Sequence, residues 1–537
     1  MKQVFQKFAH HSPMIILVVY LCVNLVSFWF SQNRELVNHF EDDAYYYFKI
    51  AANIVDLNMI TFDTLTLTSG FHPLWMLVLL PLTAAINNPF LFLRTVGIIS
   101  TLLIGTGAIF AFRYLQKRYS PLATLFASAM MLSCLIDFGS TGMETSLLIP
   151  LLTISILILA KLSPWSRSDK TPGQEKYWIW LGISLSLAQL ARLDAFLFNL
   201  TILVYIFFSD RSAQKWMRLI KTGLPIFITG CAYLLFNFFT YQHLFPTSGL
   251  SKSIQGGWIN KAFMAQLFNF KNPEGTAWNL YLALIFVAIG FVVYYLTNTL
   301  RKRKNQQKGE SNTLPLIVSA FFLLYTLYQL FGTSWVLWRW HLYPIYLMSM
   351  TVIPFMVEKF LARLQQNTKS LIPTKKIIAV CIISIFMLMT VIGITAGNWQ
   401  KTQKILFPYE NYLIAKELNT TLQQPVIFAM GDRAGSFAYF FNGDVLQIEG
   451  LVSDYSVIQA IEENTLEQYM TDFGVQYVVS QAAPPSNYSE WTLLTPLPKH
   501  SSGPKAEIRL CKRSEFLRRE TQFEPIFIWK WPSCLSE

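Results

Sequence analysis

Two adjacent aspartates carry the strongest chemical signal in this sequence. Asp42 and Asp43 lie in the segment EDDAYYYFKIAANI, directly after the first long apolar run. An acid at mid-bilayer costs about 2.5–3.5 kcal/mol on insertion scales, so such acids usually line a water-filled cavity or the surface. Mutual repulsion raises the pKa of one member of a carboxylate pair, which suits a general base. The pair could also ligate Mg²⁺ or Mn²⁺ with a substrate phosphate, or cap the following helix.

Seven further charged residues and histidines stand at the ends of apolar runs. One of them, Lys252, follows small hydroxyl residues in PTSGLSKS, a spacing that is not a P-loop but still suits a phosphate contact. The full set is His72, Glu144, Arg192, Asp194, Lys252, Arg339 and His341. We predict that these residues bind the substrate or its phosphate.

Most of these residues also have an ordinary structural explanation. The proline after His72 and the acid at Glu144 are both typical of a first helical turn. Arg192 and Asp194 could pair with each other, or Arg192 could hold a phosphate. Arg339, which is flanked by aromatic residues, could belong to an interfacial belt or could meet a phosphate while a tryptophan stacks on a sugar. The sequence leaves these alternatives open.

The segments that must position these residues are long apolar runs. Of the 537 residues, 53% are hydrophobic and 14% are charged. Runs such as Met14–Phe30 and Leu219–Phe239 can cross about 30 Å of hydrocarbon as helices. With the shorter runs they predict about twelve spans (about 11–13 transmembrane helices) in a polytopic α-helical domain, residues 1–397. We expect the first run to be a signal anchor that is not cleaved.

Basic residues gather in alternate loops, and this predicts the orientation of the chain. The basic loops, which should face the cytosol, lie near 2–7, 113–118, 161–176, 211–221, 301–308 and 359–376. The other loops, which hold the residues singled out above, should share the opposite face. One conflict concerns residues 73–112: two full spans there would put the loop at 113–118 on the wrong side. Either 73–94 is a partial or re-entrant span, or the segment count is off by one.

Two local segments hold some of the candidate residues. Aromatic and apolar residues at helical spacing over 45–54 predict an amphipathic helix on the membrane surface, with the two aspartates at head-group depth. The run 177–208 is interrupted by Arg192 and Asp194, which predicts two short helices joined at the charged pair. A single kinked helix with a buried ion pair is the alternative.

The composition changes near residue 398. Short apolar runs such as Pro425–Met430 and Val475–Ser480 alternate with helical patterns, which predicts a small α/β domain over 398–537, outside the cytosol. Cys511 and Cys534 lie in this tail and could form a disulfide there, whereas the other four cysteines, Cys22, Cys134, Cys231 and Cys381, lie in apolar runs. The net charge of +12 follows from the basic loops, so we expect no nucleic-acid partner.

Taken together, these segments resemble the GT-C superfamily of membrane glycosyltransferases. The closer likeness is to bacterial members related to the protein mannosyltransferases and the lipid A aminoarabinose transferase. Those enzymes have an acidic pair in the first extracytoplasmic loop and a KPPL or HPPL motif at the second span; the matching stretches here are Glu41–Tyr45 and Gly70–Trp75, with one proline in place of two. Residues 142–145, 191–195, 246–253 and 434–451 also resemble a group of uncharacterised bacterial GT-C proteins.

The resemblance implies an inverting-type glycosyltransferase of the bacterial inner membrane. Its donor would be a polyprenyl-phosphate sugar, and its acceptor a glycan, lipid or protein on the periplasmic side. Asp42 or Asp43 would take the proton from the acceptor hydroxyl, and Arg192, Lys252 and Arg339 would neutralise the leaving phosphate. No cofactor is certain; Mg²⁺ or Mn²⁺ at the aspartates stays open, because metal dependence varies within the superfamily.

Two other classes of protein compete with this interpretation. A transporter or flippase would carry charges at the membrane midplane and often shows inverted repeats, whereas here the charges lie at helix ends on one side and no repeat is evident. A non-catalytic protein of glycan assembly could use the same scaffold. These features favour an enzyme.

Overall fold

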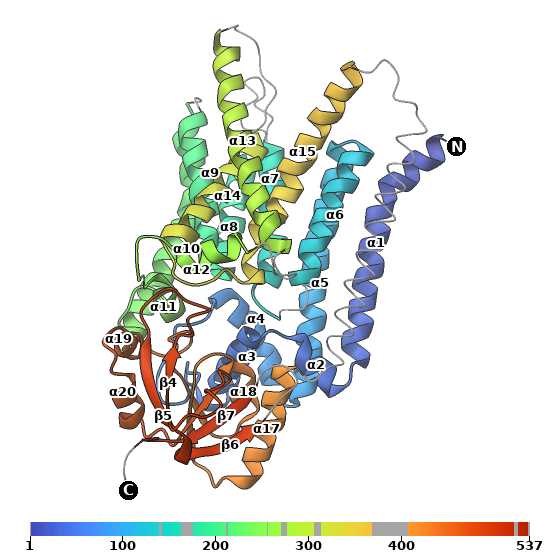
Figure 1. Ribbon diagram of the computed structural model, residues 1–537. Coiled ribbons are helices and arrows are strands. Elements are labelled where there is room, and N and C mark those ends of the chain that lie inside the picture. Colours follow the sequence, from blue (N-terminus) through green and yellow to red (C-terminus); the bar gives the residue numbers. More distant parts are fainter. Residues whose placement is uncertain are drawn as a thin grey trace.

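The protein is a bundle of long helices with a strand-containing domain at one end (Figure 1). The computed structural model describes residues 2–138, 142–162, 175–210, 213–254, 256–269, 276–304, 313–367, 406–519 and 525–534. Within these residues, seven helices are long and apolar enough to cross a membrane. The chain is therefore a multi-pass membrane protein, as the apolar runs predicted.

The first five helices resolve the conflict over residues 73–112. They are α1 (Lys2–Phe30), α2 (Asn33–His39), α3 (Asp42–Leu57), α4 (Pro73–Ala85) and α5 (Pro89–Arg118). Helix α4 has 13 residues, which gives a length of only about 20 Å and cannot cross the hydrocarbon. The 30-residue α5 does cross. The lengths of α4 and α5 therefore favour the partial-span alternative.

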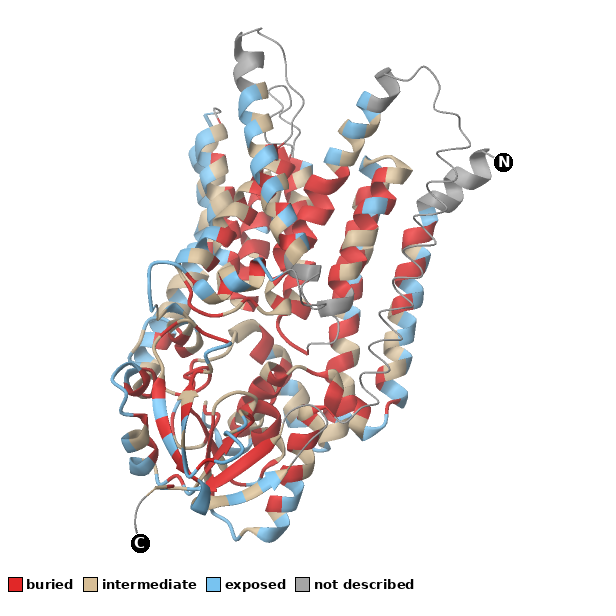
Figure 2. Cartoon of the chain, viewed as in Figure 1, coloured by how far each residue is buried: buried red, intermediate tan, exposed pale blue. Residues whose placement is uncertain are grey.

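The remaining bundle helices bury their apolar faces against one another. They are α6 (Pro121–Phe138), α7 (Thr145–Leu162), α8 (Glu175–Ala191), α9 (Phe196–Ser209), α10 (Lys215–Tyr241), α13 (Thr276–Lys304), α14 (Thr313–Phe331) and α15 (Tyr343–Asn367). Figure 2 shows buried residues along the inner faces and exposed ones along the outside of α10 and α13. Exposed apolar side chains on α10, such as Phe227 and Phe239, suit contact with lipid. The expected span at 377–394, with Cys381, lies outside the described residues.

The run 177–208 is two helices, as predicted. Helix α8 ends at Ala191, Arg192 is extended, and a single 3₁₀ turn (η1, Leu193–Ala195) leads into α9. Short helices α11 (Thr247–Ser253) and α12 (Lys261–Leu267) follow α10, and a 3₁₀ turn (η3, Arg339–His341) precedes α15. The short helices α11 and α12 lie at the end of the bundle that adjoins the C-terminal domain (Figure 1).

The C-terminal domain is α/β, as predicted. Its sheet has the order β2-β1-β3-β7-β6, from β1 (Ile427–Met430), β2 (Asp444–Gln447), β3 (Tyr477–Ser480), β6 (Glu515–Arg519) and β7 (Ile526–Lys530). Strand β1 is parallel to β2 and β3, whereas β7 is antiparallel to its neighbours. A hairpin of β4 (Glu490–Thr495) and β5 (Ala506–Cys511) stands apart, and the helices are α17 (Phe407–Thr421), α18 (Ala434–Phe440), α19 (Tyr455–Glu462) and α20 (Leu466–Asp472). The expected boundary at 397/398 lies outside the described residues.

Helix α3 joins the bundle to this domain. The helix is present where the sequence predicted one, but its place on the membrane surface is a wrong prediction. It packs between α4 and α18, and Tyr45, Phe48 and Ile50 are fully buried. Its aromatic residues contact α18, for example Tyr45 against Tyr439 at 5.6 Å between ring centroids. The apolar face that suggested contact with lipid is therefore covered by protein.

The two tail cysteines form a disulfide. Cys511, at the end of β5, is bonded to Cys534, 23 residues further along the chain. Among the other described cysteines, Cys22 and Cys231 are free thiols. The bond ties the end of the chain to the hairpin.

We expect loss of this disulfide to destabilise the C-terminal domain. Closing a loop of 23 residues restricts the unfolded chain by about 3 kcal/mol in the chain-entropy account. The double variant C511S/C534S should therefore lower the domain's thermal midpoint by roughly 10 °C, measured by differential scanning fluorimetry. C22S, which removes an exposed free thiol, is the control and should leave the midpoint unchanged. An equal midpoint in C511S/C534S and wild type would contradict the expectation.

Candidate functional site

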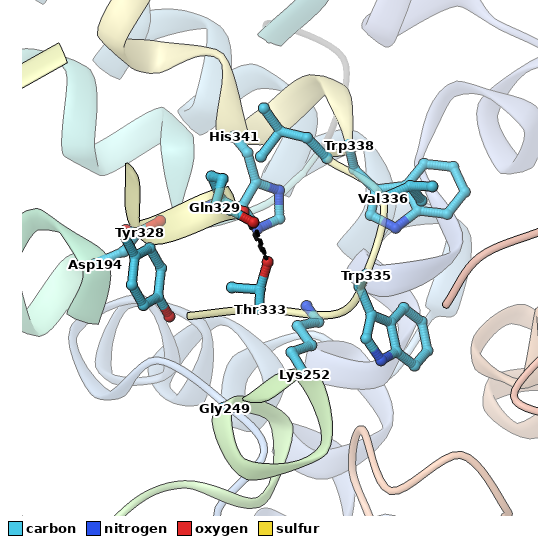
Figure 3. Close-up of a pocket in the computed structure, with 11 residues that line it drawn as sticks. Asp194, Gly249, Lys252, Tyr328, Gln329, Thr333, Trp335, Val336, Trp338 and His341 are labelled. Atoms are coloured by element: carbon cyan, nitrogen blue, oxygen red, sulfur yellow. Dashed lines mark hydrogen bonds between the residues drawn. The ribbon is translucent and has the colours of Figure 1, made fainter. Parts of the chain in front are cut away.

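Two adjacent cavities lie where the bundle meets the C-terminal domain. The bundle cavity holds about 440 Å³ of atom-free space, and the interdomain cavity about 660 Å³, both partly open to solvent. Lys252, Trp335 and Trp338 line both. Figure 3 shows Lys252 extending from α11 toward the loop that carries Thr333 and Trp335.

The two aspartates at the start of α3 have different partners. Both carboxylate oxygens of Asp42 are occupied: the backbone N–H of Gly435 donates at 2.7 Å, and Ser436 donates from its N–H at 2.8 Å and its hydroxyl at 2.5 Å. Asp43 is partly exposed and lines the interdomain cavity. Asp42 therefore fastens the C-terminal domain to α3, while Asp43 is left to face the cavity.

Burial raises the pKa of both acids. It raises the pKa of Asp42 to about 6, against the lowering effect of the Ser436 and Gly435 hydrogen bonds. The pKa of Asp43 rises to about 7, because burial and the negative charge of Asp42 outweigh the attraction of Lys252. A carboxyl group with a pKa near neutrality is suited to act as a general base at physiological pH.

Lys252 is the cation that faces Asp43. Within the described part of the chain, no hydrogen bond or ion pair engages its ammonium group, although its backbone oxygen accepts from the Ser334 N–H at 2.8 Å. Burial lowers the pKa of Lys252, and nearby Asp43 opposes that shift. A partly buried cation without a fixed partner is available to an anionic ligand.

Arg192, in contrast, is fully engaged. Its guanidinium bonds Glu144 at 2.9 Å and holds Asp194 in a bidentate pair at 3.0 and 3.1 Å. It also donates to the Trp340 carbonyl at 3.3 Å, and the arginine and Glu144 are buried. This cluster ties α7 to the α8–α9 junction and to η3. The mutual pairing of Arg192 and Asp194, one of the two alternatives from the sequence, is the one observed.

Two histidines flank this cluster. His72, the residue before α4, has its Nε2 at 4.0 Å from Glu144 Oε1, and burial lowers the pKa of His72 to about 4, so its ring is neutral at physiological pH. His341 lines the bundle cavity with Asp194 (Figure 3). Arg339 is not among the described residues that line either cavity. Eight of the nine predicted residues thus lie in or beside one site, and Arg339 stands apart.

The C-terminal domain supplies residues that sequence reasoning missed. Asp432, Arg433, Glu449 and His500 all line the interdomain cavity. A signal was present for the first two, because Gly431-Asp432-Arg433 directly follows the apolar strand β1, and ligands of α/β domains bind at the carboxyl ends of parallel strands. Nothing in the sequence connects this edge with residues 42 and 43.

A divalent cation does not fit the aspartate pair in this arrangement. Asp42 already accepts three hydrogen bonds, and Asp43 faces a lysine. Among the described residues, the only group of three candidate metal ligands in reach of one another is Glu490 with Cys511 and Cys534, and those thiols are joined in the disulfide.

Comparisons with known proteins show the fold. No family model matches the sequence, and no curated protein matches it. The crystal structure of the Archaeoglobus fulgidus oligosaccharyltransferase tethered with an acceptor peptide is 13% identical, has a TM-score of 0.51, and is matched over 88% of this chain and 69% of that one. ArnT from Cupriavidus metallidurans in the apo state is 12% identical with a TM-score of 0.49, over 86% and 92% of the two chains. The chain shares the membrane fold of that oligosaccharyltransferase, in agreement with the fold that its motifs implied.

Proposed function

We propose that this chain is an inverting-type glycosyltransferase that moves a sugar from a polyprenyl-phosphate donor to a glycan, lipid or protein acceptor of the cell envelope. The observation that carries the proposal is that Asp43 and the uncommitted Lys252 line the same cavity. A base and a cation across a small-molecule cavity are what glycosyl transfer to a hydroxyl needs. The GT-C fold supports this choice among enzyme classes.

In the proposed reaction, Asp43 removes the proton from the acceptor hydroxyl. The acceptor oxygen forms a bond to the anomeric carbon while the bond from that carbon to the lipid phosphate oxygen breaks, through an oxocarbenium-like state. The electron pair leaves on the phosphate, whose added negative charge Lys252 neutralises. Asp42 holds α3 and therefore the base in place through Gly435 and Ser436.

We further propose that the site faces the periplasm of a bacterial cell, with the chain in the inner membrane. The site and the C-terminal domain lie at the opposite end of the bundle from the basic ends of α5 and α7 (Figure 1), and basic loops stay in the cytosol. The Cys511–Cys534 disulfide agrees, since such bonds persist in oxidising compartments.

Reconstitution tests the reaction. The full-length protein in nanodiscs would be mixed with undecaprenyl-phosphate sugars and with membranes from a strain lacking the protein, and both the modified acceptor and the released undecaprenyl phosphate would be measured by mass spectrometry. A transferase produces both. A flippase would move the lipid without cleaving it, so intact donor with every sugar and acceptor fraction would contradict the proposal.

Lys252 should matter for the rate of transfer. K252M removes the charge that neutralises the leaving phosphate, and loss of one such contact costs roughly 10²-fold in kcat. The donor KM should rise as well, because the ground-state phosphate is also charged. K261M, on the exposed face of α12, is the matched control and should behave as wild type. Equal rates for K252M and K261M would remove Lys252 from the mechanism.

A further inference from the structure

Two acids of the C-terminal domain project from the same sheet edge. Asp432 follows the end of β1, and Glu449 follows the end of β2. The strands are parallel neighbours, with Met430 opposite Gln447. Their carboxyl ends therefore meet at one edge, which is the usual place for ligands in α/β domains.

These acids lie between two cavities. The interdomain cavity is lined by Asp43, Asp432 and Glu449. A second one, the sheet-edge cavity, has about 290 Å³ of atom-free space and is lined by Asp432, Glu449 and residues of β3 and β4. Asp432 and Glu449 line both cavities, so a molecule bound at Asp43 in the interdomain cavity meets both acids.

Each acid has an oxygen without a hydrogen bond among the described residues. Glu449 is 2% exposed, and its Oε1 accepts none. Asp432 Oδ2 also accepts none, although Arg433 Nε forms an ion pair with it at 3.6 Å and His500 Nδ1 lies 3.9 Å from Oδ1. Leaving a buried polar atom unsatisfied costs about 1–3 kcal/mol, so these oxygens are positioned for a ligand.

The surroundings suit hydroxyl groups. Burial, followed by the charge of Asp432, raises the pKa of Glu449 well above its usual range, and the unsatisfied oxygens of both acids can accept hydrogen bonds from hydroxyl groups. A hydroxyl both donates and accepts. Trp338, which lines the interdomain cavity, is stacked on Trp340 with ring centroids 5.6 Å apart, and its flat apolar face suits packing against a sugar ring.

We propose that Asp432 and Glu449 form an acceptor subsite that binds the hydroxyl groups of a glycan, with Trp338 as the platform for its sugar ring. This assignment rests on the proposed function and narrows its acceptor from glycan, lipid or protein to a saccharide. It also gives the C-terminal domain a direct part in recognition.

Direct binding tests the subsite without relying on transfer. The full-length protein in nanodiscs would be titrated with a panel of neutral di- and trisaccharides, followed by saturation-transfer difference NMR, for wild type, E449Q, D432N, D43N and the exposed control E463Q. We expect at least one saccharide to bind wild type and E463Q alike. E449Q and D432N should each weaken its binding about tenfold, and thermal midpoints would verify that both variants fold.

The outcomes separate this inference from the proposed function. Saccharide binding that is unchanged in E449Q and D432N, or absent from wild type at millimolar concentration, overturns the subsite. Hydroxyl-bearing peptides that bind in a Glu449-dependent way while saccharides do not would also overturn it, in favour of a protein acceptor. If saccharides bind as expected but D43N leaves undecaprenyl phosphate release intact, the subsite stands and the proposed catalytic role fails.

Discussion

Replacing Asp43 with asparagine should reduce sugar transfer by roughly 10²–10⁴-fold, the range for loss of a general base. Asparagine has nearly the same shape but cannot accept the proton of the acceptor hydroxyl. The cavity would keep its shape, so the donor KM should change little. Initial rates of undecaprenyl phosphate release in nanodiscs measure both parameters.

The neighbouring variant D42N is the matched comparison. Its amide oxygen can still accept from Gly435 or Ser436, but its NH₂ group must face one of the N–H donors that now contact a carboxylate oxygen. We expect a loss of about 1–3 kcal/mol in stability and a smaller loss of rate than in D43N. If D42N were inactive and D43N active, the assignment of the base would be reversed.

The rate should also depend on pH through Asp43. Its pKa is raised to about 7, and only the deprotonated carboxylate can act as base. Transfer should therefore increase with pH through neutrality and level off above it, with roughly a tenth of the plateau rate at pH 6. In D43N the residual rate should lose this step. A wild-type profile that is flat between pH 5.5 and 8.5 would contradict the assignment.

Removing Arg192 should have the largest effect on stability. In R192M, Glu144 loses its cation and Asp194 loses a bidentate partner, at a buried junction. Breaking a buried ion pair from one side costs about 3–5 kcal/mol, because the remaining charges are uncompensated. We expect a lower thermal midpoint and less monodisperse protein on size-exclusion chromatography.

Two companion variants make this test specific. K221M breaks the more exposed Lys221–Glu175 pair and should cost under about 1 kcal/mol. The triple variant R192M/E144Q/D194N removes all three charges, so it should regain part of the stability lost in R192M. If R192M lowers the thermal midpoint no more than K221M does, the charged cluster does not stabilise the fold, and Arg192 again becomes a candidate phosphate ligand.

The sequence alone determined the features that depend on composition and local spacing. Long apolar runs can only be satisfied as helices in a bilayer, so the membrane domain was predictable, as was the change to an α/β tail. The break at Arg192 was predictable too, since charges interrupt an apolar run. That Asp42 and Asp43 could act as a general base also followed from their residue type and from their position beside an apolar run. The motifs around them led to the correct fold.

Only the tertiary structure decided which aspartate is free. The partners of Asp42 lie 393 and 394 residues away, and no local pattern encodes a contact between such distant segments. Likewise, an apolar stretch of 13 residues is too short for its pattern to separate a partial span from a full one, and the aromatic face of α3 looks the same whether lipid or α18 covers it. Asp432 and Glu449 meet Asp43 because the parallel strands β1 and β2 end together and Asp42 holds that domain against α3.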